Sequence, residues 1–350
     1  MKKIAFTRKN VAEVIEVAEP KIGDGEVLVR LARSTISSGT ERANLTGVPD
    51  CATGIYNDCP VDQVTWPRFL GYSSAGIVEQ VGADVKSVQI GDRVALSWST
   101  HSELVALPER LVYAIPDGVD FEAAAITHIT TFPMAAIRKC RLEIGESAMV
   151  MGQGILGQLA VMLLKAAGAA PIVAADPVAA KREQALKLGA DYAFDPTAPD
   201  FATQVKSVAD NGRKVQEGRV DDAGPKVVIE VTGNGKALDN ALDAIAPLGR
   251  LALLGCTRDS NFTINYYRKV HGRGVTMVGA HTNARPDCES SSGWWTTRDD
   301  ALAFLKLLEL GRVSLKGFVA EVHPVAEAPA VYERLAKGGA FPVVQFDWNK

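Results

Sequence analysis

The chain has 350 residues, and its 38 Lys and Arg nearly balance its 41 Asp and Glu, which leaves a formal net charge of −3. Such a small charge gives no electrostatic case for binding nucleic acid or an anionic membrane. With 47% hydrophobic and 23% charged residues, the composition is that of a globular protein long enough for two domains.

Neither the N-terminal stretch nor the cysteines indicate a secreted or membrane protein. Residues 1–6 are basic, but their apolar run stops at once, and no apolar run in the sequence reaches the length of a membrane-spanning helix. The five cysteines include no C-x-x-C pair, so neither a disulfide framework nor a zinc ribbon is predicted. We therefore expect a cytoplasmic protein without a membrane or nucleic-acid partner.

The first third of the chain is predicted to form short strands. Residues 26–33 alternate apolar and polar side chains, as a half-buried strand does, and residues 76–81 and 92–96 repeat the pattern. These strands are punctuated by glycines at Gly71, Gly76, Gly82 and Gly91. The pattern indicates a partly open β-barrel.

The stretch of residues 148–176 carries the clearest functional signal. An apolar run over 148–151 predicts a buried parallel strand, and residues 156–167 predict a helix rich in Ala and Leu. Between them, G-Q-G-I-L-G places Gly152, Gly154 and Gly157 in G-x-G-x-x-G spacing. A glycine-rich turn is the alternative interpretation of the motif alone, and its position between a strand and a helix favours a dinucleotide site.

Each position of this motif has a physical role. The first glycine permits a tight turn, the second lets the backbone approach a pyrophosphate, and the third lets the helix pack closely on the strand. Ile155 and Leu156 open the helix, whose free amide groups attract phosphate. Asp176 ends the next strand, where a carboxylate accepts hydrogen bonds from a ribose and repels a 2′-phosphate. The predicted cofactor is therefore NAD.

Two later strands should complete the cofactor site. Residues 226–233 and 250–255 are apolar runs typical of a parallel sheet, whose carboxyl ends bind the ligand. We expect the nicotinamide end to be lined by Thr232, Gly233, Leu254 and Gly255. His281 ends a further apolar run over residues 275–281, and it is the histidine that we place nearest the cofactor.

Several motifs in order resemble those of one enzyme superfamily. The series V-L-V-R-L-A-R-S-T-I-S-S-G-T-E, F-L-G-Y-S-S-A-G-I-V-E-Q-V-G, I-G-D-R-V-A and V-I-E-V-T-G is similar to that of the medium-chain dehydrogenase/reductases, which include zinc alcohol and sorbitol dehydrogenases. The resemblance implies an α/β protein with a GroES-like, partly open β-barrel catalytic domain (residues 1–127 and 282–350). It also implies a Rossmann domain with a doubly wound parallel sheet (residues 128–281).

The sequence departs from this superfamily at the catalytic metal. By resemblance, Ser37 replaces the first cysteine ligand, Tyr72 replaces the histidine of G-H-E, and Ile126 falls on the third ligand position. Serine, tyrosine and isoleucine do not make a zinc site, which needs thiolate, imidazole or carboxylate donors. We predict no bound metal, with His128 as the one nearby imidazole.

Without zinc, side chains must handle the proton that accompanies hydride transfer. Tyr72 either binds the reacting oxygen or only fills the volume that the metal leaves. Ser37, Ser38 and Thr40 lie on the superfamily's proton-relay segment, and the alternative is that they are ordinary turn residues. Glu41 and Arg42 either pair with each other or face the nicotinamide ribose.

Two further expectations follow from the resemblance, and two other segments each have two possible interpretations. Lys181 matches a position that reaches the adenosine ribose, although an exposed lysine on a helix is equally compatible with the sequence. Residues 261–265 resemble an edge strand that pairs across a dimer axis, so we expect a homodimer or homotetramer. Residues 282–295 contain Trp294 and Trp295, which either stack on a sugar or belong to the core. The polar segment 48–66 is either a pocket wall or a surface excursion.

Together these features predict an NAD-dependent, zinc-independent dehydrogenase (EC 1.1.1). It would interconvert a secondary alcohol and a ketone on a small molecule, most plausibly a sugar, cyclitol or polyol. An enoyl or quinone reductase of the same superfamily is one alternative, and Asp176 argues against it because those relatives mostly use NADPH. A non-catalytic NAD-binding protein is the other.

Overall fold

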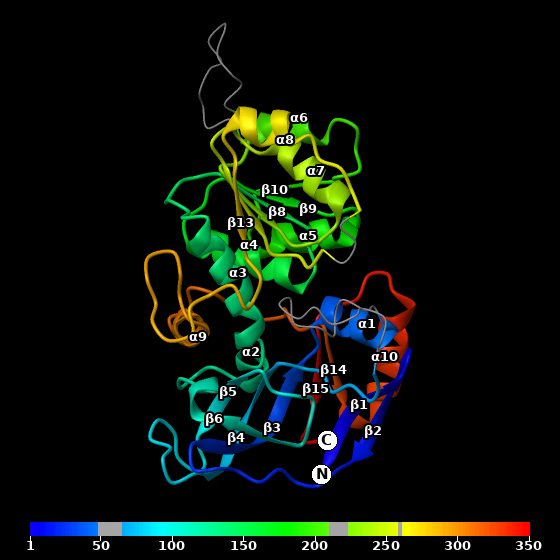
Figure 1. Ribbon diagram of the computed structural model, residues 1–350, viewed down its shortest axis with the longest axis vertical. Coiled ribbons are helices and arrows are strands. Elements are labelled where there is room, and N and C mark those ends of the chain that lie inside the picture. Colours follow the sequence, from blue (N-terminus) through cyan, green and yellow to red (C-terminus); the bar gives the residue numbers. More distant parts are fainter. Residues whose placement is uncertain (48–64, 210–222, 258–260) are drawn as a thin grey trace, which may run out of the picture. The chain divides into compact units, whose positions relative to one another are not determined.

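The computed structural model describes residues 1–47, 65–209, 223–257 and 261–350 (Figure 1). The chain divides into two compact units. Unit 1 comprises Met1–Ile129 and Ala301–Lys350, and unit 2 comprises Thr130–Asp300. Both boundaries fall inside helices, because α3 spans Thr127–Lys139 and α9 spans Thr297–Glu309.

Unit 1 is built mainly of strands. Its strands are β1 (Lys2–Arg8), β2 (Val11–Glu16), β3 (Glu26–Thr35), β4 (Ser73–Val81), β5 (Arg93–Ser97), β6 (Leu104–Pro108), β7 (Val112–Ala114), β14 (Glu321–Pro324) and β15 (Val344–Asp347). Its helices are α1 (Ser38–Thr46), α2 (Phe121–Ala124) and α10 (Ala328–Lys337). The main sheet has the order β14-β15-β3-β4-β5-β7, with β6 paired to β3, and β1 and β2 form a separate hairpin.

Alternation along β3 explains how this sheet buries a core. Val27, Val29 and Leu31 point to one side and pack with apolar residues of β4, β5, β6 and β7. A second apolar cluster joins Phe6 of β1 to Tyr332 of α10 and to neighbouring residues of β15. The predicted strands over 26–33, 76–81 and 92–96 are confirmed as parts of β3, β4 and β5.

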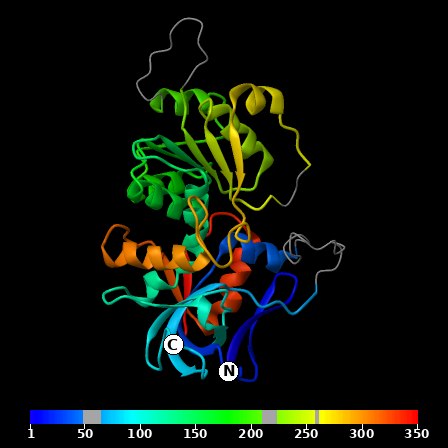
Figure 2. The ribbon, with the colours of Figure 1, turned by 60° about the vertical axis from the view of Figure 1, so that its left-hand side comes forward.

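Unit 2 is a parallel sheet with helices on both sides (Figure 2). Its strands are β8 (Ala148–Met151), β9 (Ile172–Ala175), β10 (Tyr192–Phe194), β11 (Val227–Glu230), β12 (Arg250–Leu253) and β13 (Thr276–Gly279). They lie in the order β10-β9-β8-β11-β12-β13, and every pairing is parallel. The helices are α4 (Ile155–Ala166), α5 (Ala179–Leu188), α6 (Phe201–Val208), α7 (Gly235–Ala244) and α8 (Tyr266–Lys269).

The strands of unit 2 read as apolar runs because both faces of the sheet are covered. Met149 and Met151 of β8 pack with residues of α6 and α7, and Val150 between them is equally buried. The GroES-like and Rossmann-like architecture predicted from the sequence is confirmed, down to the limits of β8.

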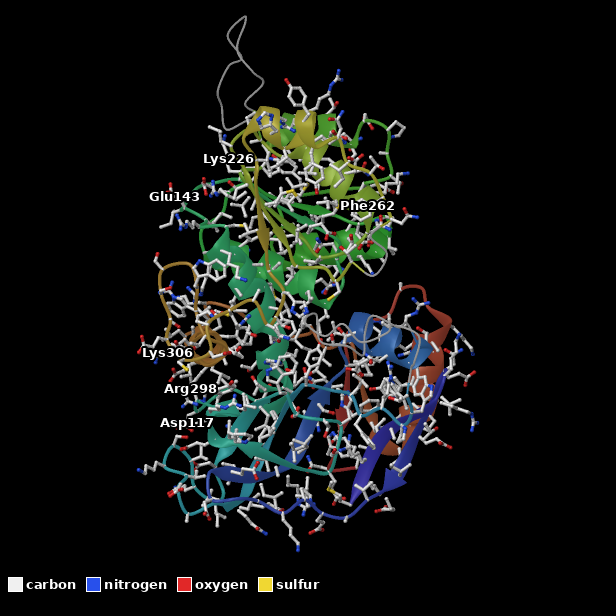
Figure 3. All side chains as sticks on the ribbon, in the orientation of Figure 1. Asp117, Glu143, Lys226, Phe262, Arg298 and Lys306 are labelled. Carbon is white, nitrogen blue, oxygen red and sulfur yellow. The ribbon has the colours of Figure 1, made fainter. Side chains whose placement is uncertain are left out.

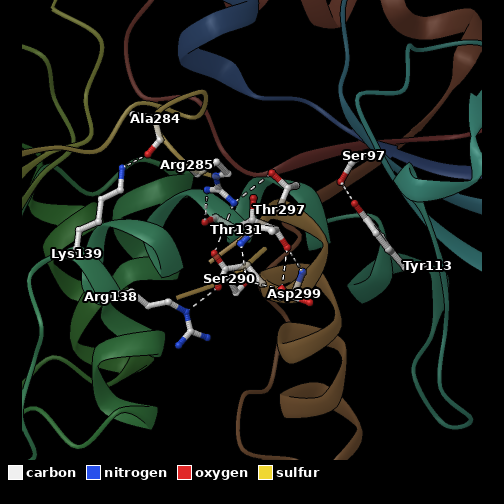
Figure 4. Close-up of polar contacts among 12 residues, drawn as sticks. Ser97, Tyr113, Thr131, Arg138, Lys139, Ala284, Arg285, Ser290, Thr297 and Asp299 are labelled. Carbon is white, nitrogen blue, oxygen red and sulfur yellow. Dashed lines mark hydrogen bonds and ion pairs between the residues drawn. The ribbon is translucent and has the colours of Figure 1, made fainter. Parts of the chain in front are cut away.

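The division between the units differs from the predicted boundary at residue 281, because residues 282–300 belong to unit 2. Contacts with α3 account for this (Figure 4). Lys139 Nζ donates to the carbonyl oxygens of Gly279, at 3.0 Å, and of Ala284. Burial, followed by the nearby Arg285 guanidinium, lowers the pKa of Lys139 to about 8. The lysine thus ties the chain that leaves β13 to α3.

The two adjacent tryptophans are held by two adjacent cations of α3. The Arg138 guanidinium lies 3.5 Å from the centre of the Trp295 ring, and Lys139 Nζ lies 4.7 Å from that of Trp294. Arg138 Nε also donates to Asp300 Oδ1 at 2.8 Å. These contacts hold both rings in place, but Trp294 is 41% exposed and Trp295 is only partly buried, so the expectation that they belong to the core is not confirmed.

Residues 261–265 form no strand, which corrects the expectation of an edge strand there. Ile264 is buried in the core of unit 2, and Asn265 caps α8 by accepting from the Arg268 amide at 3.1 Å. Phe262, labelled in Figure 3, lies against Gly235 at the start of α7. This segment therefore packs on its own unit, and a homodimer or homotetramer stays a prediction without that support.

The polar segment 48–66, expected to be a pocket wall or a surface excursion, lies almost wholly outside the described parts of the chain, with only Thr65 and Trp66 described. In the described part of the chain, none of the helices combines the length and apolar character needed to cross a bilayer.

A histidine on β14 makes the stability of unit 1 depend on pH. His323 Nε2 lies 2.9 Å from Glu321 Oε2, and Nδ1 lies 2.6 Å from Glu327 Oε2. The bonds to Glu321 and then Glu327 raise the pKa of His323 above its ordinary 6.5. The stabilisation is therefore complete below the unfolded pKa and is lost as pH rises through the folded pKa.

We expect His323→Gln to lower the melting temperature more at about pH 6 than at about pH 9, as measured by thermal unfolding. The matched control is Lys306→Gln, which removes the ion pair with Glu309 on α9 (Figure 3). That pair contains no imidazole, so its loss should have the same effect at both pH values. Equal losses for His323→Gln would contradict the pH dependence.

Candidate active site

The loop after β8 has the geometry expected of a dinucleotide-binding turn. Gly152 has φ of +96°, a conformation that side chains rarely adopt, and a Cβ there would lie 2.6 Å from Thr232 Cγ2. The Gly152 amide donates to the carbonyl oxygen of Ala175 at 2.7 Å, which fixes the turn against β9. Only glycine fits this position.

The other two glycines differ in the space around them. A Cβ on Gly157 would lie 1.9 Å from the carbonyl oxygen of Gly152, so the first turn of α4 rests directly on the loop. A Cβ on Gly154 would meet nothing within 4 Å. Gly154 is exposed and caps α4, whose first amides belong to Ile155 and Leu156. The motif thus presents open backbone at a helix N-terminus, which fits a pyrophosphate.

Asp176 lies at the end of β9 with its carboxylate held by the loop. Its Oδ2 accepts from the Gln153 amide at 2.8 Å, and its Oδ1 accepts from the Val178 amide at 2.9 Å. Lys181 Nζ lies 4.0 Å from Asp176 Oδ2. The structure therefore brings Asp176 and Lys181, two predicted adenosine-side residues, beside the glycine loop.

The predicted nicotinamide residues gather at the ends of β11 and β12. Glu230 Oε1 accepts from the Thr232 amide at 2.7 Å and from its hydroxyl, and Oε2 accepts from the Gly233 amide at 3.1 Å. The Glu230 carbonyl accepts from the amides of Leu254 and Gly255, both at 2.9 Å. Burial raises the pKa of Glu230. One buried carboxyl thus orders this edge of the sheet.

His281 follows β13 and is half-buried. The Ala280 amide donates to Leu253 at 3.0 Å, which brings the chain past the end of β12. His281 Nδ1 accepts from the Asn283 amide at 3.2 Å. Burial, and then the positive charge of Lys139, lower the pKa of His281, so its neutral form is favoured.

The catalytic candidates lie in unit 1, where two of them make direct contact. The Tyr72 hydroxyl donates to Ser37 Oγ, and both side chains are buried. Ser37 is the N-cap of α1, but its side chain does not cap the helix. Instead, the Glu41 carboxylate accepts from the Ser37 amide at 2.8 Å. The Ser37 hydroxyl is therefore available to the phenol.

The neighbouring candidates are placed differently. Ser38 and Thr40 lie in the first turn of α1, and among the described residues neither side chain hydrogen-bonds to Tyr72 or Ser37. Glu41 is completely buried, whereas Arg42 is exposed beside Gly338. Glu41 and Arg42 therefore do not pair, because they occupy opposite sides of α1.

Aromatic rings surround the Tyr72 phenol. The His128 ring packs edge-on against Tyr72, at 5.6 Å between centroids, and against Trp98, at 4.7 Å. Trp98 follows β5 with φ of +58°, and its ring is 43% exposed. A bulky residue in this conformation is an outlier of the kind that concentrates at functional sites.

The three positions of the superfamily's zinc ligands do not fit a zinc ion. Ser37 and Tyr72 offer only hydroxyl groups, which they share with each other, and Ile126 is a buried hydrocarbon. Within the described ranges, no three His, Cys, Asp or Glu side chains are grouped so that they could hold a metal ion.

Two family models match the chain at the places that the sequence indicates. Residues 23–117 match the alcohol dehydrogenase GroES-like domain, and residues 156–295 match the zinc-binding dehydrogenase domain. The chain belongs to the medium-chain dehydrogenase/reductase superfamily. It is an oxidoreductase of the alcohol dehydrogenase-like type within that superfamily.

Relatives in the superfamily match most of the chain. D-guloside 3-dehydrogenase of Escherichia coli (strain K12) is 25% identical over 346 residues, which cover 95% of each chain. L-threonine 3-dehydrogenase of Pyrococcus horikoshii is 25% identical over 303 residues, which cover 77% of this chain and 79% of the relative. A zinc-binding-dehydrogenase-type protein of Sinorhizobium meliloti 1021, solved with NADP, has a TM-score of 0.77 at 18% identity and covers 99% of this chain and 98% of its own.

Sequence reasoning missed two residues that organise these sites, Glu230 and Trp98, and it missed the partners of a third, Glu41. Glu230 is an acidic residue at the end of the otherwise apolar strand β11, and this acid within an apolar run could have identified it. No sequence signal pointed to Trp98, because its positive φ arises only in the folded chain. Glu41 was noticed, but its partners His101 and Tyr332 lie 60 and 291 residues away in sequence.

The second and third glycines of the motif provide a matched pair of variants. We expect Gly157→Ala to lower the free energy of unfolding by about 3 kcal/mol, because its Cβ collides with backbone. Gly154→Ala should keep the wild-type melting temperature but weaken NAD binding about tenfold, or about 1.4 kcal/mol. Thermal unfolding and NAD titration by tryptophan fluorescence measure the two effects. Undiminished NAD affinity in Gly154→Ala would argue against pyrophosphate at this backbone.

Proposed function

We propose that the protein is an NAD-dependent, zinc-independent dehydrogenase that interconverts a secondary alcohol and a ketone. The observation that carries this proposal is the buried hydroxyl pair of Tyr72 and Ser37, which stands where superfamily members bind a catalytic metal. The chain keeps the dinucleotide loop but replaces the metal ligands with hydrogen-bonding groups. Such a combination suits hydride transfer with proton handling by side chains.

The cofactor preference rests on Asp176. Its carboxylate is fixed by two amides at the end of β9, where it can accept from ribose hydroxyls and would repel a 2′-phosphate. Gly154 leaves room for the pyrophosphate, and Thr232, Gly233, Leu254, Gly255 and His281 form the other end of the proposed site. When bound, a nicotinamide exchanges a hydride with the carbon that bears the reacting oxygen.

Tyr72 and Ser37 have distinct tasks in this proposal. Tyr72 serves as a hydrogen-bond donor in this arrangement, because its single hydroxyl hydrogen points to Ser37 Oγ. Ser37 Oγ accepts from Tyr72 and keeps its own hydrogen to donate. Together they would hold a substrate oxygen in place as its carbon changes between carbinol and carbonyl.

A sugar, cyclitol or polyol is the proposed substrate class. The half-exposed Trp98 ring offers an apolar face beside the hydroxyl groups of Tyr72 and Ser37, as ring-shaped polyhydroxy compounds require. One relative that aligns over 95% of the chain is named a D-guloside 3-dehydrogenase, a sugar dehydrogenase by its name.

Turnover should be measured on a panel of sugars, cyclitols and polyols with NAD, before and after dialysis against a chelator. We expect turnover on at least one panel member, unchanged by chelation, with no zinc found by elemental analysis. Loss of activity on chelation would contradict zinc independence. NADH oxidation with enones or quinones, in the absence of turnover on the panel, would favour a reductase instead.

The matched variant for this assay is Tyr72→Phe, which removes only the hydroxyl. It should lower kcat by about 100-fold because Ser37 loses the hydrogen bond that orients its own hydroxyl hydrogen toward the substrate oxygen. NAD affinity measured by fluorescence should not change, since the cofactor residues of unit 2 are intact. Full turnover in Tyr72→Phe would remove this tyrosine from the mechanism.

Asp176→Asn tests the cofactor preference without changing the shape of the side chain. Loss of the negative charge should shift the ratio of NAD to NADP affinity toward NADP by about tenfold. The control is Asp200→Asn, an exposed carboxylate of the same unit that contacts Gln204. Fluorescence titrations with both cofactors measure the ratio, and an unchanged ratio in Asp176→Asn would refute the assignment.

A further inference from the structure

We infer that Glu41, supported by His101 and Tyr332, is a positioning residue that holds Ser37 in place for Tyr72. This inference deepens the proposed function and rests on it, because Ser37 and Tyr72 are its candidate catalytic groups. It assigns a task to three buried polar side chains that touch neither of the two candidate hydroxyl groups directly.

Glu41 is a carboxylate completely removed from solvent and surrounded by donors. Its Oε1 accepts from the Ser37 amide at 2.8 Å. Its Oε2 lies 3.2 Å from His101 Nε2 and accepts from the Tyr332 hydroxyl. Glu41, His101 and Tyr332 are each no more than 1% exposed. Because a buried charge is costly unless it is hydrogen-bonded, these three donors offset the cost of burying the carboxylate.

The hydrogen bonds behind His101 fix its orientation. His101 Nδ1 lies 2.8 Å from Ser34 Oγ, which itself accepts from Trp348 Nε1 at 2.8 Å. A carboxylate oxygen only accepts, so His101 presents Nε2–H to Glu41, and in the neutral imidazole Ser34 then donates to Nδ1. The donors point in one direction, from Trp348 through Ser34 and His101 to the carboxylate. Burial, followed by the charge of Glu41, raises the pKa of Tyr332 well above 10, so Tyr332 also stays a donor.

His101 also contacts the segment that carries Tyr72. Its amide donates to the Leu70 carbonyl at 2.9 Å, and a Cβ on Gly71 would lie 2.8 Å from the imidazole ring. Gly71 has φ of +93°, so the chain turns around the imidazole immediately before Tyr72. The Glu41–His101 contact therefore joins the helix that begins with Ser37 to the strand that begins after Tyr72.

The nature of the Ser37 contact decides what Glu41 can do. Glu41 meets the backbone amide of Ser37 and not its hydroxyl, and an amide does not pass a proton onward. Glu41 is therefore no part of a proton relay. It fixes the backbone of Ser37 and so the direction in which Ser37 Oγ meets the phenol of Tyr72.

Glu41→Gln is the informative substitution because its amide cannot satisfy all three donors. Its single oxygen would turn to the two donors His101 and Tyr332, which would leave its NH2 group against the Ser37 amide. Glu41→Asp keeps the charge but is one methylene shorter, so it too should lose the hydrogen bond from the Ser37 amide. Tyr332→Phe is the control, because it removes a donor to Oε2 and leaves the Ser37 contact with Oε1 intact.

The first readout is the environment of Tyr72 itself. Protein labelled with fluorotyrosine has seven tyrosine signals in 19F NMR, and Tyr72→Phe assigns one of them. We expect that signal to move in Glu41→Gln and Glu41→Asp but to stay in Tyr332→Phe. A Tyr72 signal that stays in folded Glu41 variants, whatever their melting temperature, would overturn the inference, since a purely structural role changes stability alone.

The second readout is turnover in a double-mutant cycle. Glu41→Gln should lower kcat about tenfold at unchanged NAD affinity, and it should have no further effect in a Tyr72→Phe background. Equal losses in both backgrounds would overturn the positioning role. If the Tyr72 signal moves in Glu41→Gln while Tyr72→Phe keeps full turnover, the positioning holds and the proposed catalytic use of Tyr72 fails.

Discussion

The close approach of α4 to β8 is the constraint on which unit 2 depends. A Cβ on Gly157 would lie 1.9 Å from the Gly152 carbonyl oxygen, so the helix can begin only where no side chain intervenes. That contact places the first turn of α4 directly after the strand and leaves Gly154 exposed at its N-terminus. The same turn offers the Gln153 amide to Asp176. One steric requirement thus arranges the helix end, the open backbone and the carboxylate together.

Buried hydrogen bonds organise unit 1 around Tyr72. Ser37 and Tyr72 are joined by a hydrogen bond, and the Glu41 carboxylate behind them is surrounded by donors from the N-cap of α1, from α10 and from the loop before β6. A pair of hydroxyl groups depends on its supports for its geometry. The buried carboxylate therefore helps to fix the backbone from which the Ser37 hydroxyl projects.

The sequence predicts local features of this protein well, because their signals are local. The glycine spacing, the apolar run of β8 and the acid after β9 lie within 29 residues, and the fold places them as expected. Failures occurred where partners are distant or packing decides. His101 and Tyr332 become partners of Glu41 only in the folded chain, and the burial of Ile264 determines that residues 261–265 stay with their own unit. The end of unit 2 was missed because Lys139 and Arg138 capture a segment more than 140 residues later.

The carboxylate of Asp176 has its orientation before any ligand arrives. Two backbone amides, from Gln153 and Val178, hold its two oxygens. A free aspartate would lose rotamer freedom when it binds a hydroxyl group, whereas this one has already lost it during folding. The entropic cost of ordering this side chain is therefore met during folding, before a ligand binds. Discrimination between ligands at Asp176 should consequently be strict, because a mismatched ligand meets a side chain that cannot rotate away.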